Sequence, residues 1–178
     1  QAEAAVRYYA PPSTRPELSV RWTAGLAGLL KQVAPGSDHQ LAVVRALAGS
    51  VTTPAGAGLL TAWLAGDEVP DGLSVDADLR WRLVTNLARL GGIDDAGIDA
   101  ELARDNTATG AEKAAGARAS RPGQQAKAEA WHLAIEDPSV PNETHSQLCG
   151  HFWQFNQDEV LRPYIDRWFA VMEDIAAQ

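Results

Sequence analysis

At 178 residues, the chain is long enough to bury a core without a disulfide or a structural metal. Its formal charge of −8 at pH 7 argues against a nucleic-acid-binding surface, because phosphate recognition requires a basic stripe. The single cysteine excludes an intrachain disulfide, and no apolar run reaches the ~20 residues of a membrane-spanning helix. We therefore expect one globular domain over residues 1–178, in the cytoplasm, with no nucleic-acid or membrane partner.

The first half of the chain predicts helices separated by glycine and proline. Helix-forming Ala, Leu, Arg, Glu and Gln dominate, and alternating β-branched runs are absent. The predicted helices span about 1–10, 15–33, 38–48 and 53–66. Ser37 is the expected N-cap of the third, and Thr53 followed by Pro54 opens the fourth. The sole methionine is Met172, so we expect the sequence to be a piece cut from a longer protein.

The second half continues the same helical pattern. The predicted helices span about 79–90, 95–104, 109–119, 121–135, 142–151 and 157–176. The first of these has the strongest apolar stripe, which runs from Leu79 to Leu90. Two helices with their short links occupy about forty residues, the size of a HEAT or armadillo unit. The predicted fold is all-α, with antiparallel helix pairs in a HEAT/armadillo-like superhelical array and a compact bundle as the alternative.

The six tryptophans mostly fall on apolar helix faces and are interpreted as core residues. Trp81 is the exception, because it lies off the leucine stripe and between Arg80 and Arg82. We interpret these three residues as a contact surface for another domain. The amphipathic start, with Val6, Tyr8 and Tyr9, is a second such surface.

Residues that carry catalysis or bind metal are scarce. A zinc peptidase helix would need the HExxH pattern, and none of the four histidines begins it. His145 and Cys149 share a helical face, but His151 points elsewhere, so only two ligands converge. Cys149 has no flanking pattern of a catalytic nucleophile. We expect no catalytic residue and no bound metal in this chain.

A resemblance adds to these observations. The run from Gly72 to Pro122, with DLRW at residues 78–81 and ELARDNTATG at 101–110, resembles the C-terminal helical domain of actinobacterial aminopeptidase N. The resemblance continues through RPYIDRWF at 162–169, and residues 1–71 have a compatible helical pattern. It implies an endoplasmic-reticulum-aminopeptidase-like C-terminal domain, shaped as a bowl of helix pairs that closes over a zinc-dependent catalytic domain.

The resemblance also implies partners and candidate site residues. The partners are the catalytic domain of the same polypeptide and the parent's peptide substrate, and zinc belongs to that upstream domain. Some members of the family hold the peptide's C-terminal carboxylate with basic side chains. Arg118, Arg121 and Lys127 are the candidates here, since charge-assisted pairing suits such groups.

Three functions are therefore compared. The leading one is a non-catalytic accessory domain that packs on the catalytic domain of an aminopeptidase N and shapes access of peptides. The alternatives are a free-standing helical-repeat adaptor, which would bind protein partners on its concave face, and an enzyme with an unrecognised site.

Overall fold

The computed structural model describes residues 2–176, and all regular secondary structure in that range is helical. The expected all-α fold is confirmed. The helices are α1 (Ala2–Ala4), the π-helix η1 (Ala5–Tyr9), α2 (Arg15–Leu30), α3 (Asp38–Ser50), α4 (Pro54–Ala65), α5 (Ala77–Arg89), α6 (Asp95–Arg104), α7 (Ala108–Ser120), α8 (Gln124–Trp131), the π-helix η2 (His132–Glu136), α9 (Asn142–Phe152), α10 (Asp158–Leu161) and α11 (Pro163–Ala176). None of these helices is long and apolar enough to cross a membrane.

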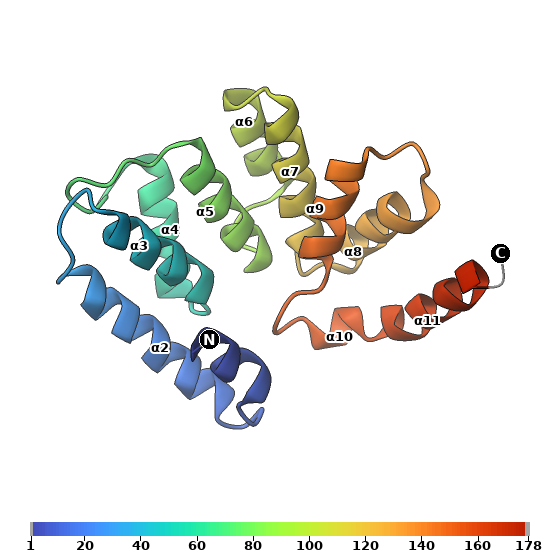
Figure 1. The fold of residues 1–178 in the computed structure, drawn as a ribbon, viewed down its shortest axis with the longest axis horizontal. Helices are drawn as coiled ribbons and strands as arrows, with labels where there is room; N and C mark the ends of the chain where they lie inside the picture. The colour runs from blue at the N-terminus through green and yellow to red at the C-terminus, as the bar shows by residue number, and fades with distance from the viewer. Residues whose placement is uncertain (1, 177–178) are drawn as a thin grey trace.

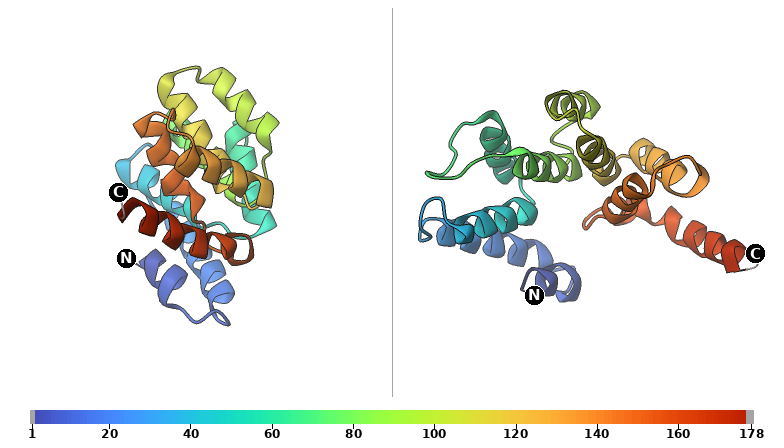
Figure 2. Two further views of the ribbon diagram at one scale, coloured as in Figure 1. Left: turned by 90° about the vertical axis from the view of Figure 1, so that its right-hand side faces the viewer. Right: turned by 45° about the horizontal axis from the view of Figure 1, so that its top comes forward.

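The helices form an arch, as Figure 1 shows. Its central row consists of α3, α5, α7 and α9, each of which contacts the next. The flanking helices α2, α4, α6 and α8 pack on this row, while the N-terminal helices and α11 lie on the open side of the arch (Figures 1 and 2). Whether the pairs are repeats of the HEAT type stays a prediction.

Side-chain caps explain where most helices begin. Ser37, Thr53 and Asp76 each accept a hydrogen bond from the backbone N–H three residues later, as Asp94 and Thr107 also do. The predicted caps at Ser37 and Thr53 are confirmed, and so is the stop at Gly66. This glycine ends α4 with φ = 91°, a conformation that is strained for a residue with a Cβ.

Two predicted helices have different bounds in the structure. The helix expected from residue 121 begins at Gln124, because Arg121 is extended and Gly123 is the N-cap. The helix expected over 157–176 is divided into α10 and α11 by Pro163. Proline has no N–H to donate, and its ring clashes with the carbonyl four residues earlier, so a continuous helix is disfavoured at that position.

The core consists of three apolar clusters that follow one another along the arch. The first lies between α2 and α5 and includes Leu26, Val44, Leu47, Leu60, Trp63, Leu79, Leu83 and Leu87. The second joins α5, α6 and α7 through Trp81, Val84, Ala88, Ile98, Ala114 and Ala117. The third is aromatic and contains Trp131, Phe152 and Tyr164 with Ala119, Ala130, Leu148 and Leu161.

Trp81 corrects one sequence-based expectation. It is only 2% exposed, belongs to the second cluster, and donates from Nε1 to Asp105 Oδ2 at 2.8 Å. The interpretation of this ring as an exposed contact surface is therefore wrong. The leucine stripe faces the first cluster, whereas α5 also packs against α7 on another side, so a helix in the central row has two buried faces.

Helix α7 is narrow where its neighbours pack against it. Ala114, Ala117 and Ala119 are fully buried, and a Cβ built on Gly116 would lie 2.9 Å from His151 Nδ1 of α9. Such a separation is shorter than van der Waals contact allows, so the His151 ring would have to move if residue 116 carried a side chain.

Buried donors join the carboxyl ends of the central row. Each is less than 9% exposed, and together they satisfy backbone carbonyls at the ends of four helices. The bonds run from Arg89 Nη2 to Val51 O at 2.8 Å, from Gln157 Nε2 to Arg89 O at 3.1 Å and Ser120 O at 2.9 Å, and from Lys127 Nζ to Ala119 O and Phe152 O at 2.7 Å each. The four helices therefore run parallel, with their carboxyl ends at one edge.

The burial of Trp81 can be tested by matched substitutions. Trp81→Ala should lower the free energy of unfolding by about 3–5 kcal/mol, because it leaves a cavity in the second cluster and an unpaired partner at Asp105. Trp153→Ala removes a ring that is 55% exposed and should cost much less. Urea denaturation of both variants measures the difference, and equal losses would contradict the packing described here.

Candidate functional site

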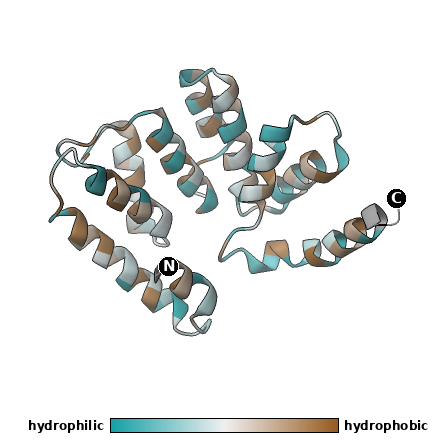
Figure 3. Cartoon of the chain, in the orientation of Figure 1, coloured by the Kyte–Doolittle hydropathy of each residue, from teal (hydrophilic) through white to brown (hydrophobic). Residues whose placement is uncertain are grey.

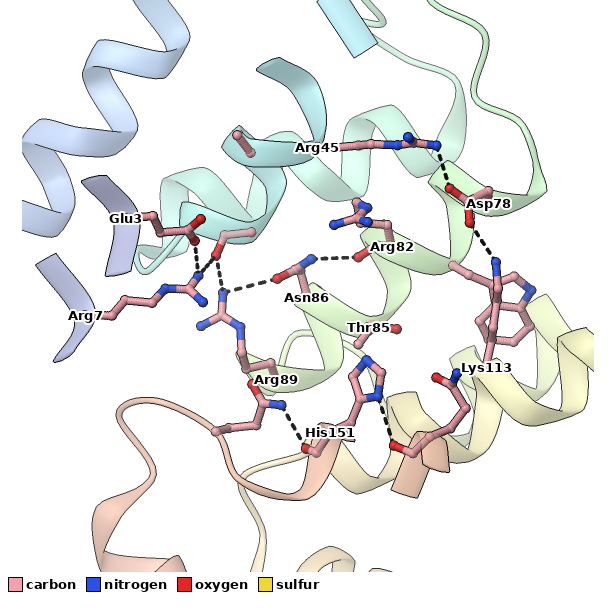
Figure 4. Close-up of a pocket in the computed structure, with 15 residues that line it drawn as sticks. Glu3, Arg7, Arg45, Asp78, Arg82, Thr85, Asn86, Arg89, Lys113 and His151 are labelled. Atoms are coloured by element: carbon pink, nitrogen blue, oxygen red, sulfur yellow. Dashed lines mark hydrogen bonds and ion pairs between the residues drawn. The ribbon is translucent and has the colours of Figure 1, made fainter. Parts of the chain in front are cut away.

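The most polar cavity lies along the central row. Its volume is about 420 Å³, and side chains from α1, η1, α3, α5, α7 and α9 surround it (Figure 4). The lining residues are Glu3, Arg7, Arg45, Ala46, Gly49, Asp78, Trp81, Arg82, Thr85, Asn86, Arg89, Lys113, Gln147, His151 and Gln154. We call this cavity the basic pocket. Its five Arg and Lys residues face two carboxylates, which leaves an excess of three positive charges on a chain whose overall charge is −8.

One end of the basic pocket is organised by Asp78. Its carboxylate accepts from Arg45 Nη2 at 2.7 Å and from Lys113 Nζ at 2.8 Å, so it joins α3, α5 and α7. The hydrogen bond from Lys113, followed by the positive charges around it, lowers the pKa of Asp78 below its usual range. Two cations share one acid here, so this end keeps one positive charge.

The other end holds a second group of three charges. Arg7 pairs with Glu3 at 2.6 Å and donates to the carbonyl of Gly49. Arg89 also approaches Gly49 O, at 3.3 Å, and is 8% exposed. Burial, together with the charge of Arg7, lowers the pKa of Arg89 to about 10. An anion bound at this end would relieve the repulsion between the two guanidinium groups.

Arg82 lies between these ends and is exposed. Among residues 3–173 it forms no salt bridge within 4.0 Å, unlike Arg45 and Lys113. Its carbonyl accepts from the Asn86 side chain, whose own oxygen lies 3.4 Å from Arg89 Nη2. Arg82, Asn86 and Arg89 thus line one face of α5 at helical spacing. This i, i+4, i+7 pattern is the sequence signal that could have located the pocket.

Arg118 and Arg121 lie away from the basic pocket. Both pair with Asp95 of α6, and Arg118 also pairs with Asp99. Neither residue lines the cavity, although the sequence analysis predicts both as substrate contacts. Their role at a substrate carboxylate stays a prediction, and the pocket supplies other cations for it.

Lys127 is buried, so the prediction that it contacts the carboxylate of a peptide substrate is wrong. The side chain is fully buried, with Nζ bonded to two backbone carbonyls and 5.3 Å from the centre of the Phe152 ring. Burial lowers its pKa to about 7. The residue instead connects the ends of α7 and α9.

Arg80 likewise makes an internal ion pair. Its Nε and Nη2 atoms each donate to Glu101 at 2.7 Å, and Nη1 donates to Leu64 O at 2.9 Å. The hydrogen bonds that Arg80 donates to Glu101 raise the pKa of Arg80. Of Arg80, Trp81 and Arg82, only Arg82 is exposed.

The three potential metal ligands of α9 do not converge. Cys149 Sγ lies 3.6 Å from His145 Nε2, whereas His151 faces the basic pocket and its Nδ1 lies 2.9 Å from Gln147 O (Figure 4). Burial raises the pKa of the Cys149 thiol. Within the described part of the chain, no group of three or more His, Cys, Asp or Glu residues could hold a metal ion.

A second cavity of about 420 Å³ is almost entirely apolar, and we call it the aromatic groove. It lies between η2, α9 and α11 and is lined by Trp131, Ala134, Ile135, Cys149, Phe152, Trp153, Tyr164, Ile165, Trp168 and Phe169. Trp153, Trp168 and Phe169 are 55%, 45% and 63% exposed. Helix α11 alternates between apolar and polar residues, which Figure 3 shows as brown and teal.

Comparisons with known proteins agree with one another. The family described as "ERAP1-like C-terminal domain" matches residues 1–177. The chain is also 41% identical over 177 residues to an aminopeptidase N of Streptomyces lividans. That alignment covers 99% of this chain but only 21% of the relative, in its C-terminal part. The chain thus spans about a fifth of the length of the curated relative that it matches.

The buried amine of Lys127 should make stability depend on pH. Its pKa is about 7 in the folded chain and has a usual value of 10.5, so the unfolded chain binds more protons between these pH values. The free energy of unfolding should therefore rise with pH across this window, by up to about 1.4 kcal/mol per pH unit, and Lys127→Met should remove that rise. Urea titrations at several pH values measure this pH dependence of the free energy of unfolding. Lys31→Met, at an exposed position, is the control. Parallel pH profiles for wild type and Lys127→Met would contradict the assignment.

Proposed function

The chain belongs to the family of ERAP1-like C-terminal domains, and on this basis we propose that it is the non-catalytic, peptide-binding domain of a zinc-dependent aminopeptidase. The observation that carries the proposal is the basic pocket, whose surplus charge suits the C-terminal carboxylate of a peptide. An aminopeptidase removes residues from the other end of its substrate. A carboxylate receptor at a distance from the zinc would therefore position long peptides and leave single aminoacyl compounds unaffected.

The chemistry itself is assigned to the polypeptide upstream of this chain. His145 and Cys149 are only two ligands, and His151 is turned toward the basic pocket. Zinc requires three protein ligands in a catalytic site, so the residues described here do not fit one. We assign no catalytic step to this chain.

The aromatic groove supports the second part of the proposal, a contact with the catalytic part of the same polypeptide. Interfaces between domains of one chain bury about 600–1,500 Å² and are partly apolar. The groove and α11 expose Trp153, Trp168 and Phe169 side by side, and large exposed apolar patches mark interaction surfaces. This surface replaces Trp81 and Arg80 as the proposed interdomain contact.

Removal of this domain from the parent enzyme tests the role in substrate access. The ratio of the rate on a long peptide to the rate on an aminoacyl amide should fall in the truncated enzyme, because only the long peptide reaches the basic pocket. Circular dichroism and metal analysis of the truncated enzyme serve as controls for folding. Equal ratios in a well-folded truncated enzyme would leave the domain with a stabilising role only.

Substitutions in the aromatic groove test the interdomain contact. The double change Trp168→Ser and Phe169→Ser should weaken binding to the separately expressed upstream polypeptide by at least about tenfold, as expected when buried aromatic anchors are lost. Val20→Ser, at a position of α2 that is 49% exposed and outside the groove, is the matched control. Isothermal titration calorimetry measures both affinities. A larger loss in the Val20 variant would place the interface on α2 instead of the groove.

A further inference from the structure

The charge of the basic pocket exceeds what one carboxylate neutralises. The terminal carboxylate of a peptide carries a single negative charge, whereas the five cationic and two anionic side chains of the lining leave three positive charges. Several cations around one cavity sum to a positive potential that attracts anions, so a ligand with more than one anionic group matches this pocket better than one with a single group.

The surplus is divided between separate positions. At the Asp78 end, Arg45 and Lys113 share one carboxylate. At the Glu3 end, Arg7 and Arg89 share another, and both approach the carbonyl of Gly49. Each end therefore has one uncompensated cation, and Arg82 adds a third between them. Two anionic groups on one ligand can each meet a cation without displacing the existing ion pairs.

The remaining lining is suited to polar atoms. Thr85, Asn86, Gln147, Gln154 and His151 supply neutral donors and acceptors around the cations. The apolar contribution is small, because Trp81 is 2% exposed and Ala46 and Gly49 offer little surface. An apolar side chain placed here would gain little burial and would separate the guanidinium groups from water.

We propose that the basic pocket selects peptides whose last residue is aspartate or glutamate, with one carboxylate received by Arg82 and the other by the cations of the Asp78 end, one helical turn away on α5. This inference rests on the proposed function, since it takes the bound group to be the end of a peptide substrate. Arg82, which forms no salt bridge with the carboxylates of residues 3–173, is the specificity-determining residue.

Four pentapeptides separate the two carboxylates. Each has four alanines followed by glutamate or glutamine, with either a free or an amidated terminus, and binding to the 178-residue chain is followed by NMR titration. The free-acid glutamate peptide should bind about tenfold more tightly than the free-acid glutamine peptide, and amidation should weaken both. The substitution Arg82→Gln should bring the glutamate-to-glutamine ratio close to one. Arg21→Gln, an equal change of charge on α2 outside the pocket, should leave the ratio unchanged.

The outcomes distinguish this inference from the function on which it rests. If the glutamate and glutamine peptides bind equally and amidation lowers the affinity of both, the preference for an acidic last residue is overturned. The proposal that the pocket binds the terminal carboxylate is then retained. If the affinity changes neither between glutamate and glutamine nor on amidation, both proposals are overturned. If Arg82→Gln does not fold, as judged by circular dichroism, Lys113→Gln provides the same comparison at the Asp78 end. If the folded variant keeps the wild-type ratio of affinities for the glutamate and glutamine peptides, the proposed positions of the two carboxylates are contradicted.

Discussion

The carboxyl ends of the central row impose the constraint on which the arch depends. Four parallel helices, α3, α5, α7 and α9, bring their terminal carbonyls and the negative ends of their dipoles to one buried edge. Water cannot satisfy carbonyls at a buried edge, so side chains must do so. Arg89, Gln157 and Lys127 donate to them, and the positive charge of Arg89 also offsets the dipoles. Each donor bonds carbonyls of a neighbouring helix or of two helices, so the same bonds fix the order of the row.

The sequence predicts local structure well because local signals decide it. Caps such as Ser37 and Thr53, and stops such as Gly66, act within one turn of the helix that they define. The helical class follows from composition alone. Helix faces were harder to predict, because a single apolar stripe assumes a single buried side. Trp81 lies off that stripe and is nevertheless buried, since α5 has neighbours on two sides.

The basic pocket could not be assembled from sequence, because its charges come from elements far apart along the chain. Arg7 and Lys113 are separated by most of the domain, and only the packing of η1 and the central row brings them around one cavity. The three cations predicted from sequence to contact a substrate lie at the end of α7 and near the start of α8. Arg118 and Arg121 form ion pairs with α6, and Lys127 is buried. Their charge was evident from sequence, whereas the direction of each side chain depends on tertiary contacts.

The small side chains of α7 have a consequence for the basic pocket. Helix axes approach one another as closely as the intervening side chains permit. Gly116 and three buried alanines leave α7 with a narrow surface between its neighbours. A Cβ built on Gly116 would lie 2.9 Å from His151 Nδ1 and 3.2 Å from Gln147 Oε1, and both of these side chains line the pocket. The space in which two polar groups of the pocket can turn is therefore determined by the absence of a methyl group on the neighbouring helix.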